Sequence, residues 1–156
     1  MYSKEELKQL NILFWEKFGK YCEVHPLLRE KNRKWVLHRT KIKDVALRFE
    51  VSRYNVKVIL ELSSKSEKLR FKAYEFMEQY KVLIEDGFDD GLIWEFYHER
   101  EDSGKEVCRI YTELNNVDFH RQNDWPQIFN FFIENMFKLE ENFLSIRDLL
   151  LEELKT

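Results

Sequence analysis

A long heptad run near the C-terminus constrains the fold more than any other feature of this sequence. Its apolar side chains repeat at alternating intervals of three and four: Phe129, Phe132, Met136, Leu139, Phe143, Ile146 and Leu150. This spacing predicts a single helix that is capped by Asp124, with Pro126 in its first turn and Gln127 completing a capping box. Over about 30 residues such a helix measures roughly 45 Å, whereas a compact chain of this length has a diameter of roughly 40 Å. The helix must therefore bend near Asn142, pair with a partner, or protrude.

Two arrangements can bury the apolar seam of this helix. In the first, the helix covers the sheet of its own chain, which is the commoner solution for an amphipathic helix. In the second, it pairs with the same helix of another subunit, and the protein is a homodimer. The residues expected to carry this self-association are Met136, Leu139, Phe143, Ile146 and Leu150.

Two alternating runs predict a β-hairpin. Apolar residues occupy positions 45, 47, 49 and 51 of the first run and positions 56, 58, 60 and 62 of the second. Period two in both arms is typical of antiparallel strands with one buried face. A turn between Arg53 and Tyr54 sets Ala46 opposite Glu61.

Further helices and strands surround this hairpin. A capping box of Ser3 and Glu6 predicts a helix over about residues 3–24, and a box of Ser64 and Glu67 predicts another that extends to Gly87. Runs at 92–99 and 106–114 predict a second hairpin, whose buried face stays open because both alternating sets mix apolar and polar residues. Residues 34–40 are predicted as an additional first strand. The order is α-β-β-β-α-β-β-α, a single α+β domain over residues 1–156, with an antiparallel sheet of about five strands, three helices and a long C-terminal helix.

The charge of the chain is unevenly distributed. The net charge of −3 argues against a general nucleic-acid binder, but residues 1–80 carry +7 and residues 81–156 carry −10. Seven basic residues stand against Glu30 alone between positions 29 and 43, with Trp35 and His38 among them. Such a stretch is typical of a site for nucleic acid or another anion, and the candidate contacts are Arg29, Arg33, Lys34, Arg39 and Lys41. The alternative is a solvated loop and strand that face the acidic half of the same or a neighbouring subunit.

Several common classes of protein lack support in the sequence. Cys22 and Cys108 form no paired motif, and the four histidines have no ligand at helical spacing, so we expect buried thiols and no metal. No phosphate-binding loop or nucleophile motif is present, and we expect no cofactor. No apolar run approaches the roughly 18 residues of a membrane span, and the N-terminus begins with charged residues. We therefore expect a cytoplasmic protein without a membrane partner.

One arrangement of strands leaves a nuclease alternative open. Helix, three-strand meander, helix and strand is also the core order of restriction-endonuclease-like nucleases, in which carboxylates hold a divalent ion and a lysine positions water. On the first hairpin, Asp44 and Glu61 would be diagonal neighbours roughly 7–8 Å apart, with Lys65 supplying the lysine. The alternative is that Glu61 pairs with Arg48, and Glu50 with Lys57, as ordinary cross-strand ion pairs.

An ordered set of aromatic landmarks resembles a known family. The landmarks are Phe14-Trp15, Phe18-Gly19-Lys20-Tyr21, Ile84-Glu85, Leu92-Ile93-Trp94-Glu95, Arg109-Ile110-Tyr111-Thr112-Glu113-Leu114 and Asn123-Asp124-Trp125-Pro126. Together they resemble the bacterial family catalogued as domain of unknown function 4268, over nearly the whole chain. The resemblance implies a cytoplasmic bacterial protein of a family that occurs alone and as the C-terminal module of longer proteins, some of which resemble nucleases. It implies no activity and assigns no catalytic residue.

These observations together predict a non-catalytic interaction or accessory module. Its expected partners are another protein, a second copy of itself, or an anion such as nucleic acid. The alternatives are a nucleic-acid-binding accessory protein that uses the basic stretch 29–43, and a divalent-metal nuclease in an intact or a degenerate form.

Overall fold

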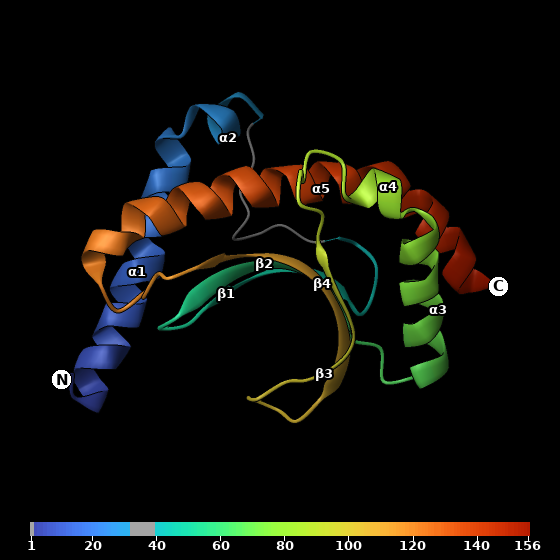
Figure 1. Cartoon of the computed structure of the whole chain (residues 1–156), viewed down its shortest axis with the longest axis horizontal. Coiled ribbons are helices and arrows are strands. Elements are labelled where there is room, and N and C mark those ends of the chain that lie inside the picture. The colour runs from blue at the N-terminus through green and yellow to red at the C-terminus, as the bar shows by residue number, and fades with distance from the viewer. Residues whose placement is uncertain (1, 32–39) are drawn as a thin grey trace.

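A four-stranded antiparallel sheet lies beneath one long helix in the computed structural model, which describes residues 2–31 and 40–156 (Figure 1). In chain order the elements are α1 (Lys4–Val24), α2 (Pro26–Lys31), β1 (Val45–Val51), β2 (Asn55–Leu62), α3 (Glu67–Gln79), α4 (Lys81–Ile84), β3 (Ile93–Glu99), β4 (Glu106–Asn115), a 3-10 turn η2 (Gln122–Asp124) and α5 (Trp125–Lys155). The α+β class and the long C-terminal helix are thus confirmed.

The sheet has the strand order β1-β2-β4-β3, and every neighbouring pair is antiparallel. The predicted register of the first hairpin is confirmed, since Ala46 lies opposite Glu61 and Glu50 lies opposite Lys57. In the described part of the chain the sheet has four strands, where about five were predicted. The segment predicted as the first strand, residues 34–40, lies outside the described residues except for Thr40, which is not in a strand.

Short helices add to the three that were predicted. The predicted first helix is confirmed as α1, with both hydrogen bonds of the Ser3–Glu6 capping box, but Pro26 then begins α2. The predicted second helix begins two residues late, because the Ser66 hydroxyl accepts the bond from Leu69 N–H. It is also divided at Tyr80 into α3 and α4.

The last helix bends instead of protruding. α5 contains 31 residues and curves along the convex face of the sheet (Figure 1). Near the predicted position, the Asn142 side-chain amide donates to the carbonyl oxygens of Ile84 and Asp86, at 2.8 Å each, which ties α5 to the end of α4. The predicted Asp124 capping box does not form, because that carboxylate accepts a hydrogen bond from the backbone N–H of Asp118.

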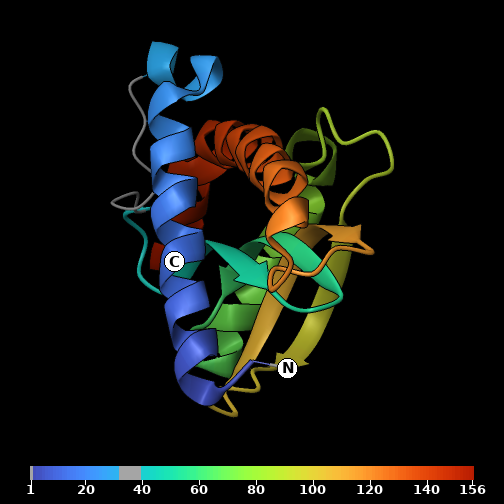
Figure 2. The ribbon, with the colours of Figure 1, turned by 90° about the vertical axis from the view of Figure 1, so that its left-hand side faces the viewer.

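The core fills the layer between α5, the convex face of the sheet, and the flanking helices. α1 crosses the first half of α5 at a steep angle (Figures 1 and 2). At this crossing the fully buried Phe14 is surrounded by rings from α1, the η2 region and α5: Trp15, Phe119, Trp125, Phe129 and Phe132. One face of the sheet is therefore committed to the core, and the opposite face is left for other roles.

Candidate functional site

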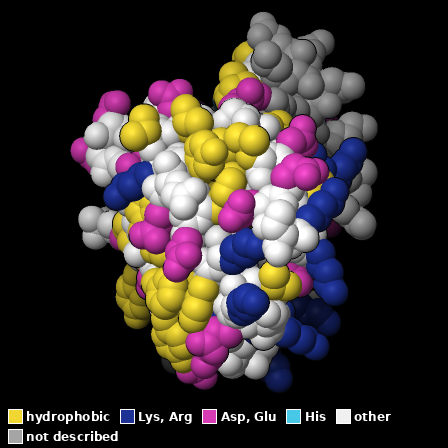
Figure 3. Space-filling view, turned by 90° about the vertical axis from the view of Figure 1, so that its right-hand side faces the viewer, with side chains coloured by type: hydrophobic (Ala, Val, Ile, Leu, Met, Phe, Trp, Pro, Cys, Tyr) yellow, Lys and Arg dark blue, Asp and Glu magenta, His cyan; other side chains and the backbone are white. Residues whose placement is uncertain are grey.

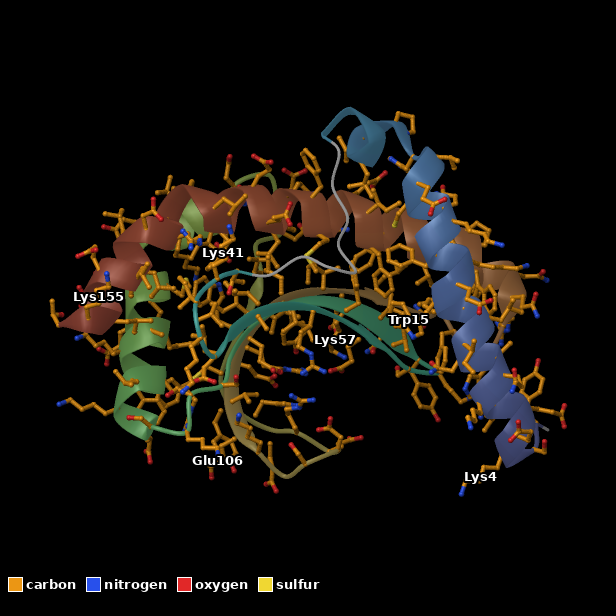
Figure 4. All side chains as sticks on the ribbon, turned by 180° about the vertical axis from the view of Figure 1, so that it is seen from behind. Lys4, Trp15, Lys41, Lys57, Glu106 and Lys155 are labelled. Carbon is orange, nitrogen blue, oxygen red and sulfur yellow. The ribbon has the colours of Figure 1, made fainter. Side chains whose placement is uncertain are left out.

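The concave face of the sheet collects polar side chains from all four strands. Successive side chains of a strand point to opposite faces of the sheet. The registers therefore place one set of alternate residues on the face that points away from α5. This set consists of Ala46, Arg48 and Glu50 of β1, Asn55, Lys57, Ile59 and Glu61 of β2, Val107, Arg109, Tyr111, Glu113 and Asn115 of β4, and Ile93, Glu95 and His98 of β3. Lys57 lies below the sheet on this side in Figure 4.

A buried carboxylate anchors one end of this face. Glu61 is 2% exposed, and Arg48 Nη1 donates to both of its oxygens at 2.9 and 3.0 Å. Arg100, from the loop between β3 and β4, approaches Glu61 at 3.5 Å and also binds Asp102 at 2.6 Å. The hydrogen bond from Arg100 holds the pKa of Asp102 below its ordinary value. Two guanidinium groups therefore converge on one desolvated carboxylate.

A buried guanidinium lies on the neighbouring strand, since Arg109 of β4 is the cross-strand partner of Glu61. Arg109 is 4% exposed and binds Glu50 at 3.0 Å and Glu95 at 3.2 Å. Its guanidinium carbon lies 4.9 Å from the ring centroid of Tyr111. Burial raises the pKa of Tyr111 above its ordinary value, and the nearby carboxylates of Glu95 and Glu113 raise it further.

The concave face is hollowed around these two residues. The hollow has a volume of about 470 Å³ and is lined by side chains of both signs. Its cations are Arg48, Lys57, Arg100 and Arg109, and its anions are Glu50, Glu61, Glu101 and Asp102. Tyr54 and Asn55 of the first hairpin and His98 of β3 complete the polar lining. The balanced charges and fixed donors can bind a polar partner through charge-assisted hydrogen bonds.

The structure separates the residues of the predicted nuclease site. Glu61 faces the concave hollow, whereas Asp44 and Lys65 line a different hollow beside α3. The two alternative ion pairs are both present, since Arg48 binds Glu61 and Lys57 lies 3.7 Å from Glu50. Within the described part of the chain, no group of three or more His, Cys, Asp or Glu side chains could hold a metal ion.

The predicted anion site falls largely outside the described residues. This holds for Arg33, Lys34 and Arg39, and for the side chain of Arg29. Lys41 is described: it is exposed, and its backbone adopts a left-handed conformation with φ 64°. It does not line the concave hollow.

The predicted self-association residues lie in the core of the chain. Each is at most 2% exposed: Met136, Leu139, Phe143, Ile146 and Leu150. The heptad seam of α5 is thus covered by the protein's own sheet and helices, which is the intrachain alternative.

Sequence reasoning missed the contribution of the second hairpin. Arg100, Arg109 and His98 were not among the predicted site residues, although they supply much of the concave hollow. A signal existed in the Glu–x–x–His spacing of Glu95 and His98 and in the charged residue at 109. These residues can be assigned to the concave face only when the register of β4 with β2 is known, because that register shows which alternating set faces away from α5.

Of the two thiols that were expected to be buried, Cys108 is buried and Cys22 is only partly buried. Burial raises the pKa of Cys22 to about 12 and that of Cys108 to about 11. The Cys108 thiol also lies 3.0 Å from the carbonyl oxygen of Phe96. Because the thiolate is the reacting species, these cysteines are poor nucleophiles near neutral pH.

We expect slow alkylation of the native protein as a result. At pH 8, iodoacetamide should react with Cys108 at least about 100-fold more slowly than in guanidinium chloride, because a pKa two units higher leaves about a hundredth of the thiolate. A Cys22→Ser variant isolates this reaction for mass spectrometry. Equal rates in native and denatured protein would contradict the assignment.

The fold and the site define a class: an α+β protein whose antiparallel sheet is covered by helices on one face and carries a charged hollow on the other. Residues 10–147 match the family model described as Domain of unknown function (DUF4268), and the chain belongs to this family. The resemblance found in the sequence is thereby confirmed. Searches among curated proteins and among solved structures found no match. In the described residues, no helix is both long and apolar enough to cross a membrane.

Proposed function

We propose that the protein is a non-catalytic interaction module that binds another protein on the concave face of its sheet. The observation that carries the proposal is the burial of Glu61 and Arg109 on the concave face of the sheet, which points away from α5. Burying paired charges is costly, and apolar residues of similar size often serve stability equally well. A fixed array of charges on this face is typical of a surface that recognises a polar partner by electrostatic complementarity.

The balance of charge favours a protein partner over nucleic acid. Four cations and four anions line the concave hollow. A nucleic-acid surface needs an excess of positive charge to neutralise phosphates, whereas protein partners match charges of both signs. A second copy of this chain is one candidate partner, in which case the concave face, and not the buried seam of α5, would carry the contact. Following the family resemblance, we infer that the module acts in the bacterial cytoplasm.

Affinity capture with a matched pair of variants tests the proposal. The test variant combines Tyr54→Ala with Glu101→Lys, since both side chains are exposed and line the hollow. The control combines Tyr2→Ala with Glu134→Lys, two exposed positions outside the hollow. From a nuclease-treated bacterial lysate, we expect the wild type and the control to retain the same protein. The test variant should retain at least about tenfold less of it, as expected when central contacts of an interface are lost.

Three results would overturn the proposal. If the test variant retained as much of the captured protein as the wild type does, the concave face would not be the binding surface. Loss of all captured protein after nuclease treatment would point to nucleic acid as the direct ligand. Measured turnover that depends on Glu61 or Arg109 would show that the face is catalytic.

A further inference from the structure

A second hollow lies at the other end of the molecule, between α3 and the end of α5. Its volume is about 590 Å³, and it is bounded by the turn before β1, the first turns of α3 and the last turn of α5. Pockets for small molecules usually span about 300–1,000 Å³. This hollow shares no lining residue with the concave hollow of the proposed function. Substitutions can therefore test the two hollows separately.

The floor of this hollow, which we call the α3–α5 hollow, is apolar. Ile42, Val45, Leu62 and Ala73 form its base and are each at most 7% exposed. Leu151 and Leu154 of α5 are partly buried along one wall, and Leu69 of α3 is 42% exposed at the opening. Leu69, Leu151 and Leu154 therefore supply most of the apolar surface that remains open, and covering such surface with an apolar group is favourable.

The rim of the α3–α5 hollow is cationic. Exposed lysines reach it from three separate elements: Lys43 from the turn before β1, Lys65 from the segment before α3, and Lys155 from the end of α5. Arg70 adds a fourth cation in the wall, and Asp44 is the one carboxylate among the lining residues. Outside the lining, Glu106 lies 3.5 Å from Arg70 and Glu152 lies 3.5 Å from Lys155, so Lys43 and Lys65 supply most of the uncompensated charge. Figure 3 shows Lys and Arg side chains gathered along the right-hand side of this end of the molecule. An excess of positive charge beside an apolar floor is complementary to an anionic amphiphile.

The backbone around the hollow is already engaged in hydrogen bonds within the chain. The carbonyl oxygen of Val45 accepts from the Thr40 hydroxyl, and that of Asp44 accepts from Ser63 N–H. Arg70 donates to the carbonyl oxygen of Ser64 at 2.9 Å. A peptide that binds as an added strand relies on free main-chain donors and acceptors along its groove, so these engaged groups argue against such a peptide. The hollow suits a ligand that has an aliphatic chain and a single anionic head.

The turn that presents Lys43 is held in a fixed conformation. Lys41 and Asp44 both adopt left-handed backbone conformations, with φ 64° and 63°. The Thr40 hydroxyl bridges the turn, and Arg147 of α5 donates to the Thr40 carbonyl oxygen at 2.6 Å. Strained conformations of non-glycine residues persist only where surrounding contacts enforce them, and they cluster at ligand sites.

From these observations we infer that the α3–α5 hollow binds a free fatty acid. The aliphatic chain lies against Leu69, Leu151 and Leu154, above the buried floor, and the carboxylate lies among the ammonium groups of Lys43, Lys65 and Lys155. No covalent step is involved. The hollow acts as a binding site for a carboxylate with a chain of medium length.

Calorimetric titration of the full chain with dodecanoate, below its micelle concentration, tests the inference. We expect saturable binding at one site, and about fourfold weaker binding for each methylene removed in the series from dodecanoate to octanoate. Dodecanol, with the same chain and no charge, should bind at least about tenfold more weakly, because it lacks the charge-assisted contacts.

A substitution that preserves the fold locates the site. Leu69→Glu places a carboxylate at the opening of the hollow, and with the Ser66 cap it completes a capping box, so α3 should remain stable. We expect dodecanoate affinity to fall at least about tenfold in this variant and in Lys43→Glu/Lys65→Glu. The control, Lys8→Glu/Lys20→Glu, reverses two exposed lysines of α1 and should bind as the wild type does.

Each possible result either supports or overturns binding of the fatty acid in the α3–α5 hollow. Lost affinity in both hollow variants, with a retained circular dichroism spectrum, supports the site. Binding that is equal in all variants, equal for dodecanol, or independent of chain length overturns it, as does the absence of saturable binding. Preferential binding of an acidic peptide in a parallel titration also overturns it, because the occupant would then be a protein segment.

Discussion

Replacing Phe143 by glutamate is expected to unfold the protein. Phe143 lies at the centre of the heptad seam of α5 and is 0% exposed. The substitution removes a large aromatic side chain from the core, which typically costs about 3–5 kcal/mol, and adds a carboxylate that has lost its hydration. Since native domains are stable by only about 5–15 kcal/mol, most molecules should lose their structure at 37 °C. Circular dichroism during urea unfolding measures the loss.

The next residue on the same helix supplies the control. Leu144 is 44% exposed, so Leu144→Glu should change the free energy of unfolding by less than about 0.5 kcal/mol. The pair also distinguishes the two arrangements that the heptad spacing allowed. A Phe143→Glu protein that remained folded but changed from dimer to monomer in analytical ultracentrifugation would show that the seam is an interface and not core.

Arg48→Met should destabilise the protein by about 3 kcal/mol, the lower end of the cost of breaking a buried ion pair. The Glu61 side chain is 3% exposed and receives two short hydrogen bonds from Arg48. Without Arg48, the one cation that stays within ion-pair distance of that carboxylate among the described residues is Arg100, at 3.5 Å. The midpoint of urea denaturation should fall with an unchanged slope, because the surface exposed on unfolding stays nearly the same.

Two further variants separate the charge from the packing. The combination Arg48→Met/Glu61→Leu should recover most of the lost stability, because apolar pairs often replace buried ion pairs without loss. Arg53→Met removes an exposed guanidinium from a 3.5 Å pair with Asp118 and should cost less than about 1 kcal/mol. If Arg48→Met were as mild as Arg53→Met, Glu61 would have access to water in solution.

The second hairpin explains why the candidate site could be predicted only in part. On the first hairpin one alternating set is entirely apolar, and the other is polar except for Ala46 and Ile59, so the sequence assigns Glu61 and Arg48 to the polar face and predicts their pairing. Along β3 and β4 both alternating sets contain both kinds of residue. Trp94 packs toward Tyr74 of α3, while its neighbour Glu95 binds Arg109 on the concave side. The local pattern could not distinguish these faces, because each is partly covered.

The sequence alone determined the features that depend on near neighbours in the chain. The Ser3 cap of α1, the register of the first hairpin and the length of α5 each follow from residues a few positions apart, whose spacing matches the geometry of one element. Membership of the family followed in the same way, from short ordered motifs.

Only the tertiary structure decided which surfaces remain available. It placed the seam of α5 in the core, joined Arg109 to Glu50 across 59 residues of sequence, and brought Lys65 and Lys155 to one hollow. Each of these contacts depends on the pairing of β2 with β4 or on the path of α5 over the sheet, and both join segments that are distant in the chain. The spacing of residues within one element cannot predict such pairings. They form because they bury the most apolar surface over the whole fold.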